Sequence, residues 1–268
     1  MILLFDIGNT NTHVGLANGA RVVRQADIPT AAWFTGKAKA QLARFVGKAV
    51  VGGVAICSVV PHATPLVRRA IRQLGAPSTA SARMKNHQRA ETVLGAPLEL
   101  TSKTLRGVGI DYPKPNSIGP DRLANAVAAR HRFGAPVVVV DFGTAVTFDV
   151  VDARGNYVGG IIAPGLAAMT DYLHEKTALL PRIRIREIKT AVGKSTEQAM
   201  LVGAVHGYRG LIRGLIAELK RELKTKRLPV VATGGYAKLI ASRLPEISTV
   251  EPNLTLEGLR LVWRANQP

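Results

Sequence analysis

Short apolar runs separated by polar turns make up the first 60 residues of the chain. These runs, apolar throughout or alternating with polar positions, are residues 1–6, 12–17, 20–28 and 50–60. The Asn18-Gly19 pair between the second and third runs is a signal for a tight hairpin turn. Apolar positions at 66, 71 and 74 then follow helical spacing over residues 64–74. We therefore predict strands joined by tight turns, followed by a helix.

The same order of elements starts again near the middle of the chain. Pro120 at a first helical position predicts a helix through about residue 131. Apolar runs at 137–141, 145–151 and 156–162 predict three more strands. Each half also carries the pattern Asp-x-Gly-(Asn/Thr)-(Thr/Ala), which indicates a duplicated unit with a cleft between the copies. The expected class is α/β, with domains at 1–117 and 118–268.

A long helix is predicted from a capping box, Ser195-Thr196-Glu197-Gln198, to about residue 223. Four glycines recur inside it at spacings of four, three and four: Gly203, Gly207, Gly210 and Gly214. A glycine inside a helix costs roughly 1 kcal/mol relative to alanine. The stripe therefore indicates close approach of another helix, either from a second subunit or from the same chain.

The composition of the chain is typical of a soluble intracellular protein. Of the 268 residues, 47% are hydrophobic and 5% aromatic, so aliphatic side chains must fill the core. No run reaches the ~18 apolar residues that a membrane span needs, and Asp6 interrupts the apolar N-terminus, which does not resemble a signal peptide. A lone Cys57 is consistent with a reducing cytoplasm. We expect a cytoplasmic protein with no membrane partner.

The net charge of +18 is unusual for a protein of this size. It is compatible with a polyanionic partner, with a host rich in basic proteins, or with anionic substrates. Arg182, Arg184 and Arg186 alternate with isoleucines, so an extended segment places all three on one face. We interpret that face as the solvated side of an edge strand and expect no nucleic-acid partner there.

Three turns carry the residues expected of a nucleotide site. They are Asp6 to Thr12, Asp141-Phe142-Gly143-Thr144 and Thr233-Gly234-Gly235, and each follows an apolar run. Such turns expose backbone N–H groups and hydroxyls, which bind phosphate, and the aspartates suit a cation between themselves and phosphates. Taken singly, the first turn is better explained as an ordinary hairpin and the third as an ordinary strand–helix connection. Asp141 differs, because an uncompensated carboxylate at the end of a four-valine strand is costly and favours a ligand or cation. Their order and separation together favour nucleotide binding.

A fourth element, Gly119-Pro120-Asp121-Arg122, places a carboxylate in the first turn of a helix. The helix dipole there favours the ionised form, and an ionised carboxylate can take the proton of an attacking hydroxyl. Arg122 can bind a substrate carboxylate through two hydrogen bonds. Plain helix capping with a surface ion pair explains these residues equally well. His174 and His206 are isolated in helical segments and are expected to be packing or surface residues.

Together these motifs resemble the sugar kinase/Hsp70/actin superfamily and, more narrowly, the type III pantothenate kinases. The resemblance also includes Ser58-Val59-Val60-Pro61, Tyr112, Asn125, Gly159-Gly160 and Pro164-Gly165, and it spans nearly the whole chain. It implies two RNase H-like (actin-like ATPase) domains with a nucleotide cleft between them. The implied reaction is ATP-dependent phosphorylation of pantothenate, the first step of coenzyme A biosynthesis.

The resemblance also implies roles for single residues. Asp121 is the expected general base, and Mg²⁺ and a monovalent cation (K⁺ or NH₄⁺) are expected at Asp6 and Asp141, respectively. A homodimer is expected as well. The residues expected to bind ATP are Asp6, Ile7, Gly8, Asn9, Thr10, Asn11, Thr12, His13, Thr144, Gly234 and Gly235. The residues expected to bind pantothenate are Tyr112, Gly119, Pro120, Asp121, Arg122 and Thr196.

Three other functions are compatible with the same fold. A non-catalytic, transcription-linked relative would use the positive charge, but it has no need of three carboxylates at Asp6, Asp121 and Asp141. An RNase H-like nuclease would need several carboxylates around two metal ions and no Thr-Gly-Gly turn. A superfamily kinase acting on another small acid or on a sugar is the third alternative. Pantothenate kinase is the preferred hypothesis.

Overall fold

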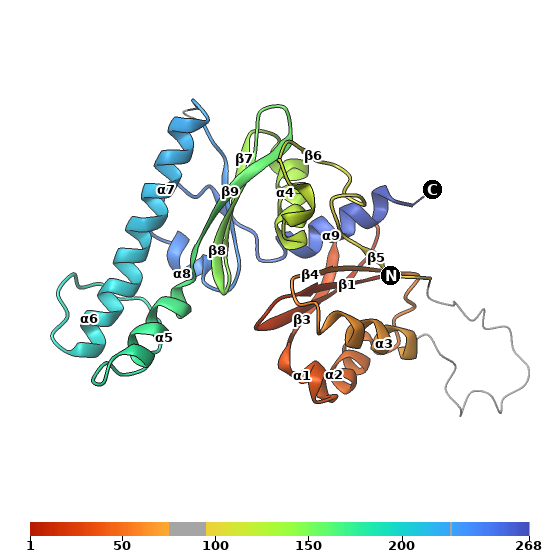
Figure 1. The fold of residues 1–268 in the computed structure, drawn as a ribbon, viewed down its shortest axis with the longest axis horizontal. Helices are drawn as coiled ribbons and strands as arrows, with labels where there is room; N and C mark the ends of the chain where they lie inside the picture. Colours follow the sequence, from red (N-terminus) through yellow and green to blue (C-terminus); the bar gives the residue numbers. More distant parts are fainter. Residues whose placement is uncertain (75–94, 226, 268) are drawn as a thin grey trace, which may run out of the picture. The chain divides into compact units, whose positions relative to one another are not determined.

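The computed structural model describes residues 1–74, 95–225 and 227–267 (Figure 1). The chain packs into two compact units. The first unit is formed within Met1–Gly107, Lys114–Ala128 and Thr255–Pro268, and the second within Val108–Pro113 and Ala129–Leu254. The dividing point near residue 128 falls inside helix α4 (Pro120–Phe133). The domain boundary expected between residues 117 and 118 stays a prediction.

The first unit is built on a five-stranded sheet in the order β3-β2-β1-β4-β5. The strands are β1 (Ile2–Ile7), β2 (Asn11–Ala17), β3 (Val22–Pro29), β4 (Gly53–Ser58) and β5 (Leu98–Glu99). β1, β2 and β3 form antiparallel hairpins, whereas β4 runs parallel to β1. The predicted strands and the Asn18-Gly19 turn are confirmed, and the fourth strand is shorter than its apolar run.

Helices cover both faces of this sheet. On one face, α1 (Ala31–Phe34), α2 (Lys37–Val46) and α3 (Thr64–Leu74) bury Trp33, Leu42 and Ile71 against Phe5 and its neighbours (Figure 1). α3 has the bounds predicted from its spacing.

The other face of the first sheet is covered by α9 (Leu254–Ala265), the last helix of the chain. A Cβ on Gly15 would lie 3.2 Å from Leu256 of this helix, and a Cβ on Gly53 would lie 2.2 Å from Trp263. Helix α9 also crosses α4 closely, because a Cβ on Gly258 would lie 1.9 Å from the carbonyl oxygen of Ala124. These contacts fix the start of α4 against the first sheet.

The second unit contains a six-stranded sheet in the order β11-β10-β7-β8-β9-β6. Its strands are β6 (Gly109–Ile110), β7 (Val137–Phe142), β8 (Ala145–Val151), β9 (Asn156–Pro164), β10 (Val230–Thr233) and β11 (Thr249–Val250). Helices α7 (Tyr208–Glu222) and α8 (Ala237–Ala241) pack their apolar side chains against Phe142 and Phe148. The unit also contains α5 (Leu166–Lys176) and α6 (Thr196–Val202).

The two units share the same pattern of buried and half-buried residues in their first two strands. Strands β1 and β7 share one sequence of buried and half-buried positions, and so do β2 and β8. In both units the fifth residue of the first strand is a half-buried aspartate, Asp6 or Asp141, within an otherwise buried strand. The duplication expected from sequence therefore extends to the position of each carboxylate.

Two local predictions need correction. The helix expected from Ser195 to about residue 223 is interrupted by a π-helical turn at Gly203–Gly207 between α6 and α7, where helix-weakening glycines occur. The capping prediction holds, since the hydroxyl of Ser195 accepts the backbone N–H of Gln198 at 3.2 Å. Residues 182–186 do not form an edge strand; they are irregular, although their arginines are exposed and the isoleucines between them are half-buried.

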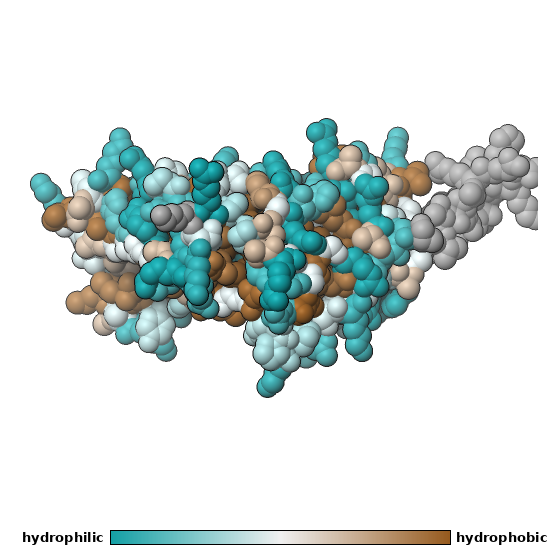
Figure 2. Space-filling view, turned by 90° about the horizontal axis from the view of Figure 1, so that it is seen from above, coloured by the Kyte–Doolittle hydropathy of each residue, from teal (hydrophilic) through white to brown (hydrophobic). Residues whose placement is uncertain are grey.

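Polar residues are distributed along the whole face of the molecule drawn in Figure 2, with smaller apolar areas between them. Among the described residues, no helix has the length and apolarity needed to cross a membrane.

Candidate functional site

The first phosphate-type turn connects β1 to β2 in the first unit. The N–H of Gly8 donates to the carbonyl oxygen of Asn11 at 3.0 Å, and Asn9 and Thr10 at the tip are exposed. The hydroxyl of Thr30 donates to the carbonyl oxygen of Gly8 at 2.6 Å. The turn is thus held from beneath while its tip remains open to a ligand.

Thr12 lies beneath this turn and is fully buried. Its hydroxyl is 3.1 Å from that of Thr30 and accepts the indole N–H of Trp33 at 2.9 Å. Thr30 and Trp33 were not predicted as site residues, and no spacing in the sequence connects them to the turn. Thr30 and Trp33 fix the end of the strand from which the turn projects, and so they hold the turn in place.

Asp6 is joined to Cys57 on the neighbouring strand. The parallel pairing of β1 and β4 places the two residues side by side, and the thiol donates to Oδ1 of Asp6 at 3.2 Å. Burial raises the pKa of the Cys57 thiol, and the negative charges of Asp6 and Asp121 raise it further. The charges of both carboxylates therefore act on one buried thiol, a residue that was not predicted to belong to the site.

Asp121 lies in the first turn of α4, where its Oδ1 accepts the backbone N–H of Arg122 at 2.9 Å. A Cβ on Gly119 would lie 2.5 Å from the same oxygen, so this position requires glycine for the carboxylate to adopt its orientation. Burial raises the pKa of Asp121, against the lowering effects of that hydrogen bond and of the Arg122 charge. Desolvation outweighs the stabilisation of the ionised form expected at a helix start, which makes Asp121 a stronger base than an ordinary aspartate.

A cavity of about 320 Å³ adjoins this helix start within the first unit. Hydroxyl and amide side chains share its lining with apolar residues: Ser58, Thr64, Thr101, Ser102 and Asn116, together with Glu99, Ile56, Leu100, Pro115, Ile118 and Pro120. The sequence motif Ser58-Val59-Val60-Pro61 contributes Ser58, which also accepts the hydroxyl of Thr64 at 2.8 Å.

The second turn, between β7 and β8, repeats the first turn in the second unit. Gly143 and Thr144 are exposed at its tip. The chain entering α5 lies against the turn, because a Cβ on Gly165 would be 2.1 Å from the carbonyl oxygen of Thr144. The Pro164-Gly165 motif therefore supports the second turn by close backbone contact.

The third turn follows β10 and lies beside Asp141. Gly234 has φ of +90°, and a Cβ there would be 2.6 Å from Oδ1 of Asp141 and 2.7 Å from the backbone of Phe142. Gly235 has open space around it, and the backbone N–H of Tyr236, the next residue, donates to the carbonyl oxygen of Phe142 at 3.5 Å. The second and third turns thus converge at the carboxyl ends of β7 and β10, which run parallel.

The remaining predicted substrate residues lie in separate parts of the structure. Tyr112, 38% exposed, contacts Tyr157 edge-on with ring centres 6.2 Å apart and closely approaches Gly159. Thr196 is exposed at the start of α6. Both belong to the second unit, whereas Gly119 to Arg122 belong to the first.

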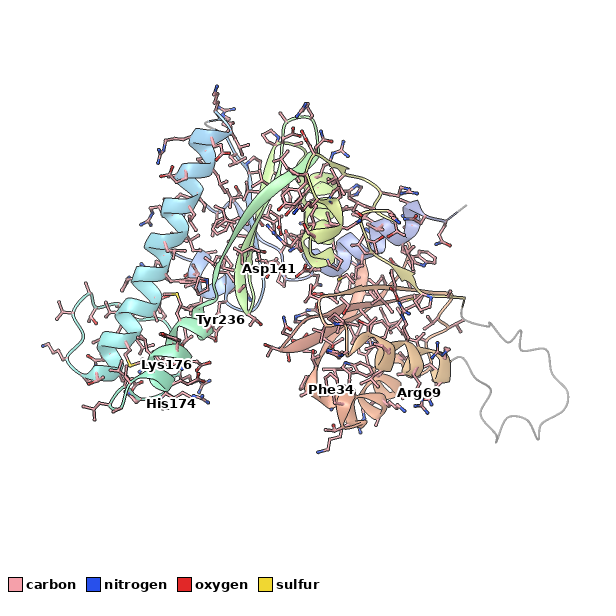
Figure 3. All side chains as sticks on the ribbon, viewed as in Figure 1. Phe34, Arg69, Asp141, His174, Lys176 and Tyr236 are labelled. Carbon is pink, nitrogen blue, oxygen red and sulfur yellow. The ribbon has the colours of Figure 1, made fainter. Side chains whose placement is uncertain are left out.

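His174 and His206, which were expected to be packing or surface residues, do not lie at these turns. Nδ1 of His174 on α5 lies 2.9 Å from the carbonyl oxygen of Leu180, and Figure 3 shows His174 at the end of α5 away from Asp141. Within the described residues, no group of three or more histidine, cysteine, aspartate or glutamate side chains could hold a metal ion alone. A cation at Asp6 or Asp141 would therefore need further ligands from a substrate, backbone or water.

Comparison with known proteins places these motifs in a family. The family model for type III pantothenate kinases matches residues 2–218. A type III pantothenate kinase of Methylacidiphilum infernorum is 40% identical over 262 residues, covering 97% of this chain and 87% of the relative. One from Roseiflexus is 37% identical with both chains fully covered.

The chain belongs to the type III pantothenate kinase family. Membership makes it a kinase that binds a nucleotide, and the sequence resemblance to this family is confirmed. A protein from Campylobacter jejuni assigned to the Baf family of transcriptional activators has a TM-score of 0.58, 17% identity and 98% coverage of both chains. A protein from Sinorhizobium meliloti assigned as a 2-dehydro-3-deoxygalactonokinase also has a TM-score of 0.58, at 15% identity and full coverage. These two structures support the sugar kinase/actin-like fold expected for the chain.

Proposed function

We propose that this kinase transfers the γ-phosphoryl group of ATP to the terminal hydroxyl of pantothenate, with Asp121 as general base. Membership of the type III pantothenate kinase family is the observation that carries the proposal. The metabolic role that follows from this reaction is the first step of coenzyme A biosynthesis.

Asp121 suits the role of base because it is half-buried and its pKa is raised by burial. In the proposed reaction the hydroxyl oxygen attacks the γ-phosphorus while its proton passes to the carboxylate. The bond from phosphorus to the bridging oxygen breaks, and ADP leaves. The N–H of Arg122 donates to Oδ1 and holds the orientation of the carboxylate, for which Gly119 leaves room, so little reorganisation is needed on reaction.

The three turns are proposed to bind ATP. Residues 6–13 would contact the phosphates through backbone N–H groups and exposed side chains, with Thr12 fixing the turn from inside. Thr144 at the tip of the second turn would contact the phosphates as well. Gly234 and Gly235 would contact the adenosine, where Gly235 leaves space for a flat base.

Mg²⁺ fits the carboxylate of Asp6, since this ion binds one or two carboxylates together with substrate phosphates and water. The monovalent cation, K⁺ or NH₄⁺, is assigned to Asp141, a half-buried carboxylate next to the adenosine turn. When bound, Mg²⁺ would neutralise charge on the transferred phosphoryl group.

Pantothenate, a carboxylic acid, is proposed to bind at the start of α4. Arg122 would hold its carboxylate through two hydrogen bonds, aided by Gly119, Pro120, Tyr112 and Thr196. The cavity of about 320 Å³ beside Pro120 offers hydroxyl groups for the polar amide and hydroxyl groups of such a substrate.

A homodimer is proposed to form along the glycine stripe. All four glycines of the stripe are exposed, and a Cβ on any of them would meet nothing within 4 Å. Large apolar side chains are also exposed in the second unit: Met169, Tyr172, Leu173, Leu179 and Val192. Open space above a helix together with exposed apolar residues is typical of a surface that a partner covers.

We place the enzyme in the cytoplasm, where ATP is available, and assign no nucleic-acid partner despite the net charge of +18. The charge would favour association with two anionic substrates, ATP and pantothenate.

The test is ATP consumption by the purified protein with Mg²⁺ and K⁺, with and without pantothenate, with Asp121→Asn as control. Release of ADP that depends on pantothenate and is absent from the variant supports substrate and base together. If a folded, ATP-binding protein releases no ADP with pantothenate, the proposed substrate is wrong, and small acids and sugars are the acceptors to test next.

A further inference from the structure

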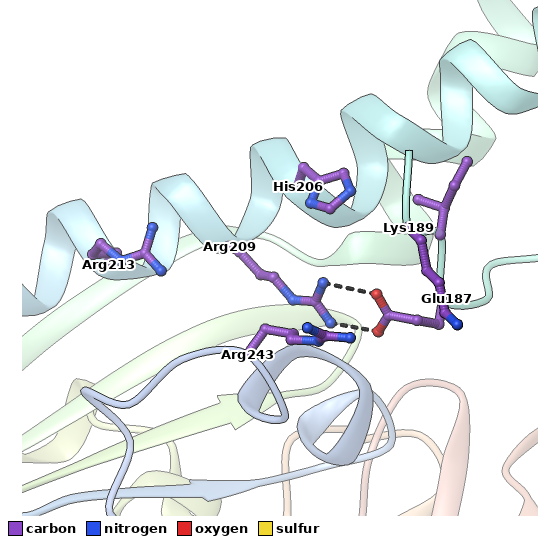
Figure 4. A pocket seen from close by; sticks show the side chains of 7 residues that line it. Glu187, Lys189, His206, Arg209, Arg213 and Arg243 are labelled. Atoms are coloured by element: carbon purple, nitrogen blue, oxygen red, sulfur yellow. Dashed lines mark hydrogen bonds and ion pairs between the residues drawn. The ribbon is translucent and has the colours of Figure 1, made fainter. Parts of the chain in front are cut away.

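A second cavity, of about 560 Å³, lies in the second unit (Figure 4). Its lining is strongly basic: Lys189, His206, Arg209, Arg213 and Arg243, with Glu187 and Ile188. No residue predicted for ATP or pantothenate binding lines it. The cavity is therefore distinct from the sites considered above.

One ion pair between a buried arginine and an exposed glutamate organises the cavity. Arg209 of α7 is only 4% exposed, and its guanidinium donates to the two carboxylate oxygens of Glu187 at 3.0 and 2.6 Å. Further hydrogen bonds join it to the carbonyl oxygens of Leu239 and Ile240 at the end of α8. Arg209 is thus a fixed part of the wall, with its donors already used within the protein.

The other cationic groups are arranged around this pair. Figure 4 shows Arg243 beside the Arg209–Glu187 pair and Lys189 near Glu187. Hydrogen bonds from Arg209 lower the pKa of Glu187, and the charges of Arg243 and His206 act in the same direction. One carboxylate therefore faces several positive groups.

Arg213 is neutralised from outside the cavity by Glu246, at 2.8 Å. Within the described part of the chain, Arg243 and Lys189 have no ion pair with a carboxylate. Both side chains belong to exposed residues and remain able to bind a ligand. The cavity accordingly carries a positive excess that the protein itself does not neutralise.

We infer that this cavity binds a small anion bearing phosphate groups, held chiefly by Arg243 and Lys189 with His206 at its edge. A guanidinium and an ammonium converging on one cavity supply the donors that phosphate oxygens accept. Bringing cationic groups together costs electrostatic energy, and a bound polyanion removes that cost.

The shape of the site favours a small molecule over a nucleic acid. The cationic groups come from three segments, namely α7 with its preceding π-turn, the residues after α8, and the irregular segment before α6, and they surround one cavity. A nucleic-acid strand would instead require a basic surface that extends along its backbone. A cavity of this volume holds a diphosphate-sized ligand.

The experiment is a titration of the full-length protein with inorganic pyrophosphate at low ionic strength, followed by calorimetry and by the NMR signal of the His206 ring. The ring signal is assigned with His206→Gln and distinguishes this cavity from the ATP-binding turns. We expect saturable movement of the His206 signal, and about tenfold weaker binding in Arg243→Gln and in Lys189→Gln. Arg184→Gln, which removes one exposed charge of the same unit outside the cavity, is expected to bind like the parent protein.

A fixed His206 signal would overturn the inference, as would unchanged pyrophosphate affinity in both cavity variants. Movement of the signal by a single-stranded oligonucleotide but not by pyrophosphate would also overturn it. Circular dichroism of each variant checks folding. Because no step of this experiment depends on turnover, its result is independent of whether pantothenate is the substrate.

Discussion

The thiol of Cys57 donates a hydrogen bond to Oδ1 of Asp6 across 3.2 Å, connecting β4 to β1 at the turn proposed to bind the phosphates of ATP. The thiol is buried, and its raised pKa keeps it protonated and able to donate. We therefore regard Cys57 as a positioning residue for Asp6.

Cys57→Ala removes this donor without introducing a larger side chain. A hydrogen bond to a charged group contributes about 1.5 kcal/mol or more, so we expect KM for MgATP to rise about tenfold. Cys57→Ser keeps a donor and is the matched control, expected to stay within about threefold of the parent. Steady-state kinetics over a range of Mg²⁺ concentrations measures the effect. Equal KM values for the two variants would remove Cys57 from the positioning of Asp6.

Asp121→Asn is expected to lower kcat by at least about 100-fold while the protein stays folded, because the proposed proton acceptor is lost. In the parent enzyme kcat/KM should fall as the pH drops through the raised pKa of Asp121, above the usual aspartate range. A pH–rate profile measures this acid limb. Near-parental turnover by the variant would eliminate Asp121 as base.

The same variant should be more stable than the parent at neutral pH. A carboxyl whose pKa is raised on folding contributes stability below its unfolded pKa, and that contribution is lost as the pH rises through the folded pKa. Asparagine has no charge to bury, so the advantage should appear at neutral pH and vanish below the unfolded value. Urea midpoints from about pH 3, below the unfolded value of roughly 3.9, up to about pH 7 test this. A variant less stable than the parent at neutral pH would contradict it.

Gly234→Ala and Gly235→Ala form a matched pair in the third turn. Alanine at 234 must adopt φ near +90° and would contact Asp141 and the backbone of Phe142, so we expect a loss of about 2 kcal/mol or more of unfolding free energy. Alanine at 235 meets nothing within 4 Å and should change stability by no more than about 0.5 kcal/mol. If Gly235 contacts the adenosine, its variant still binds ATP more weakly. Chemical denaturation and ATP titration separate the two effects.

Asp141→Ala is expected to weaken the dependence of activity on K⁺ together with activity itself, because the carboxylate is the proposed ligand of the monovalent ion. Rates measured over a K⁺ series, with Na⁺ holding ionic strength constant, give the comparison. A variant with the parental K⁺ response would place the cation elsewhere.

Gly210→Leu should convert the proposed dimer to a monomer without unfolding the subunit. Its new side chain enters open space in the single chain but would fill the surface proposed for the partner helix. Gly19→Leu is the control, because that glycine also has open space around it and belongs to a turn of the first unit. Sedimentation measures the mass of each variant. A monomeric parent protein, or a Gly210→Leu variant that remains dimeric, would reject the stripe as the interface.

Sequence pattern was sufficient for the central strands of both sheets and for α3 and α4, because these elements carry their own periodicity, whereas α2, α5 and α9 were not predicted. The bounds of α3 and the repetition of the Asp6 and Asp141 turns could be predicted from local residues alone. The break in the long helix was missed because the capping box and apolar spacing continue past Gly203 and Gly207, where the structure forms a π-turn.

Long-range neighbours could not be predicted in the same way. Cys57 comes beside Asp6 only through the pairing of two strands about 50 positions apart, and Trp33 reaches Thr12 only once α1 is packed. The raised pKa of Asp121 likewise depends on burial by the folded chain, whereas sequence alone showed only a helix start. The basic cavity joins Glu187, Arg209 and Arg243, which no motif connects.

The position of helix α9 in the sequence affects the order in which parts of the protein can fold during synthesis. The ribosome releases β1 to β4 long before the helix that covers their second face, because residues 59–253 separate β4 from α9. Most of the second unit, by contrast, is one continuous stretch from Ala129 to Leu254 and can close while the first sheet still has a bare face. A nascent chain stopped before Leu254 would therefore contain Asp6, Asp121 and Asp141 and still lack the cover of the sheet that carries Asp6.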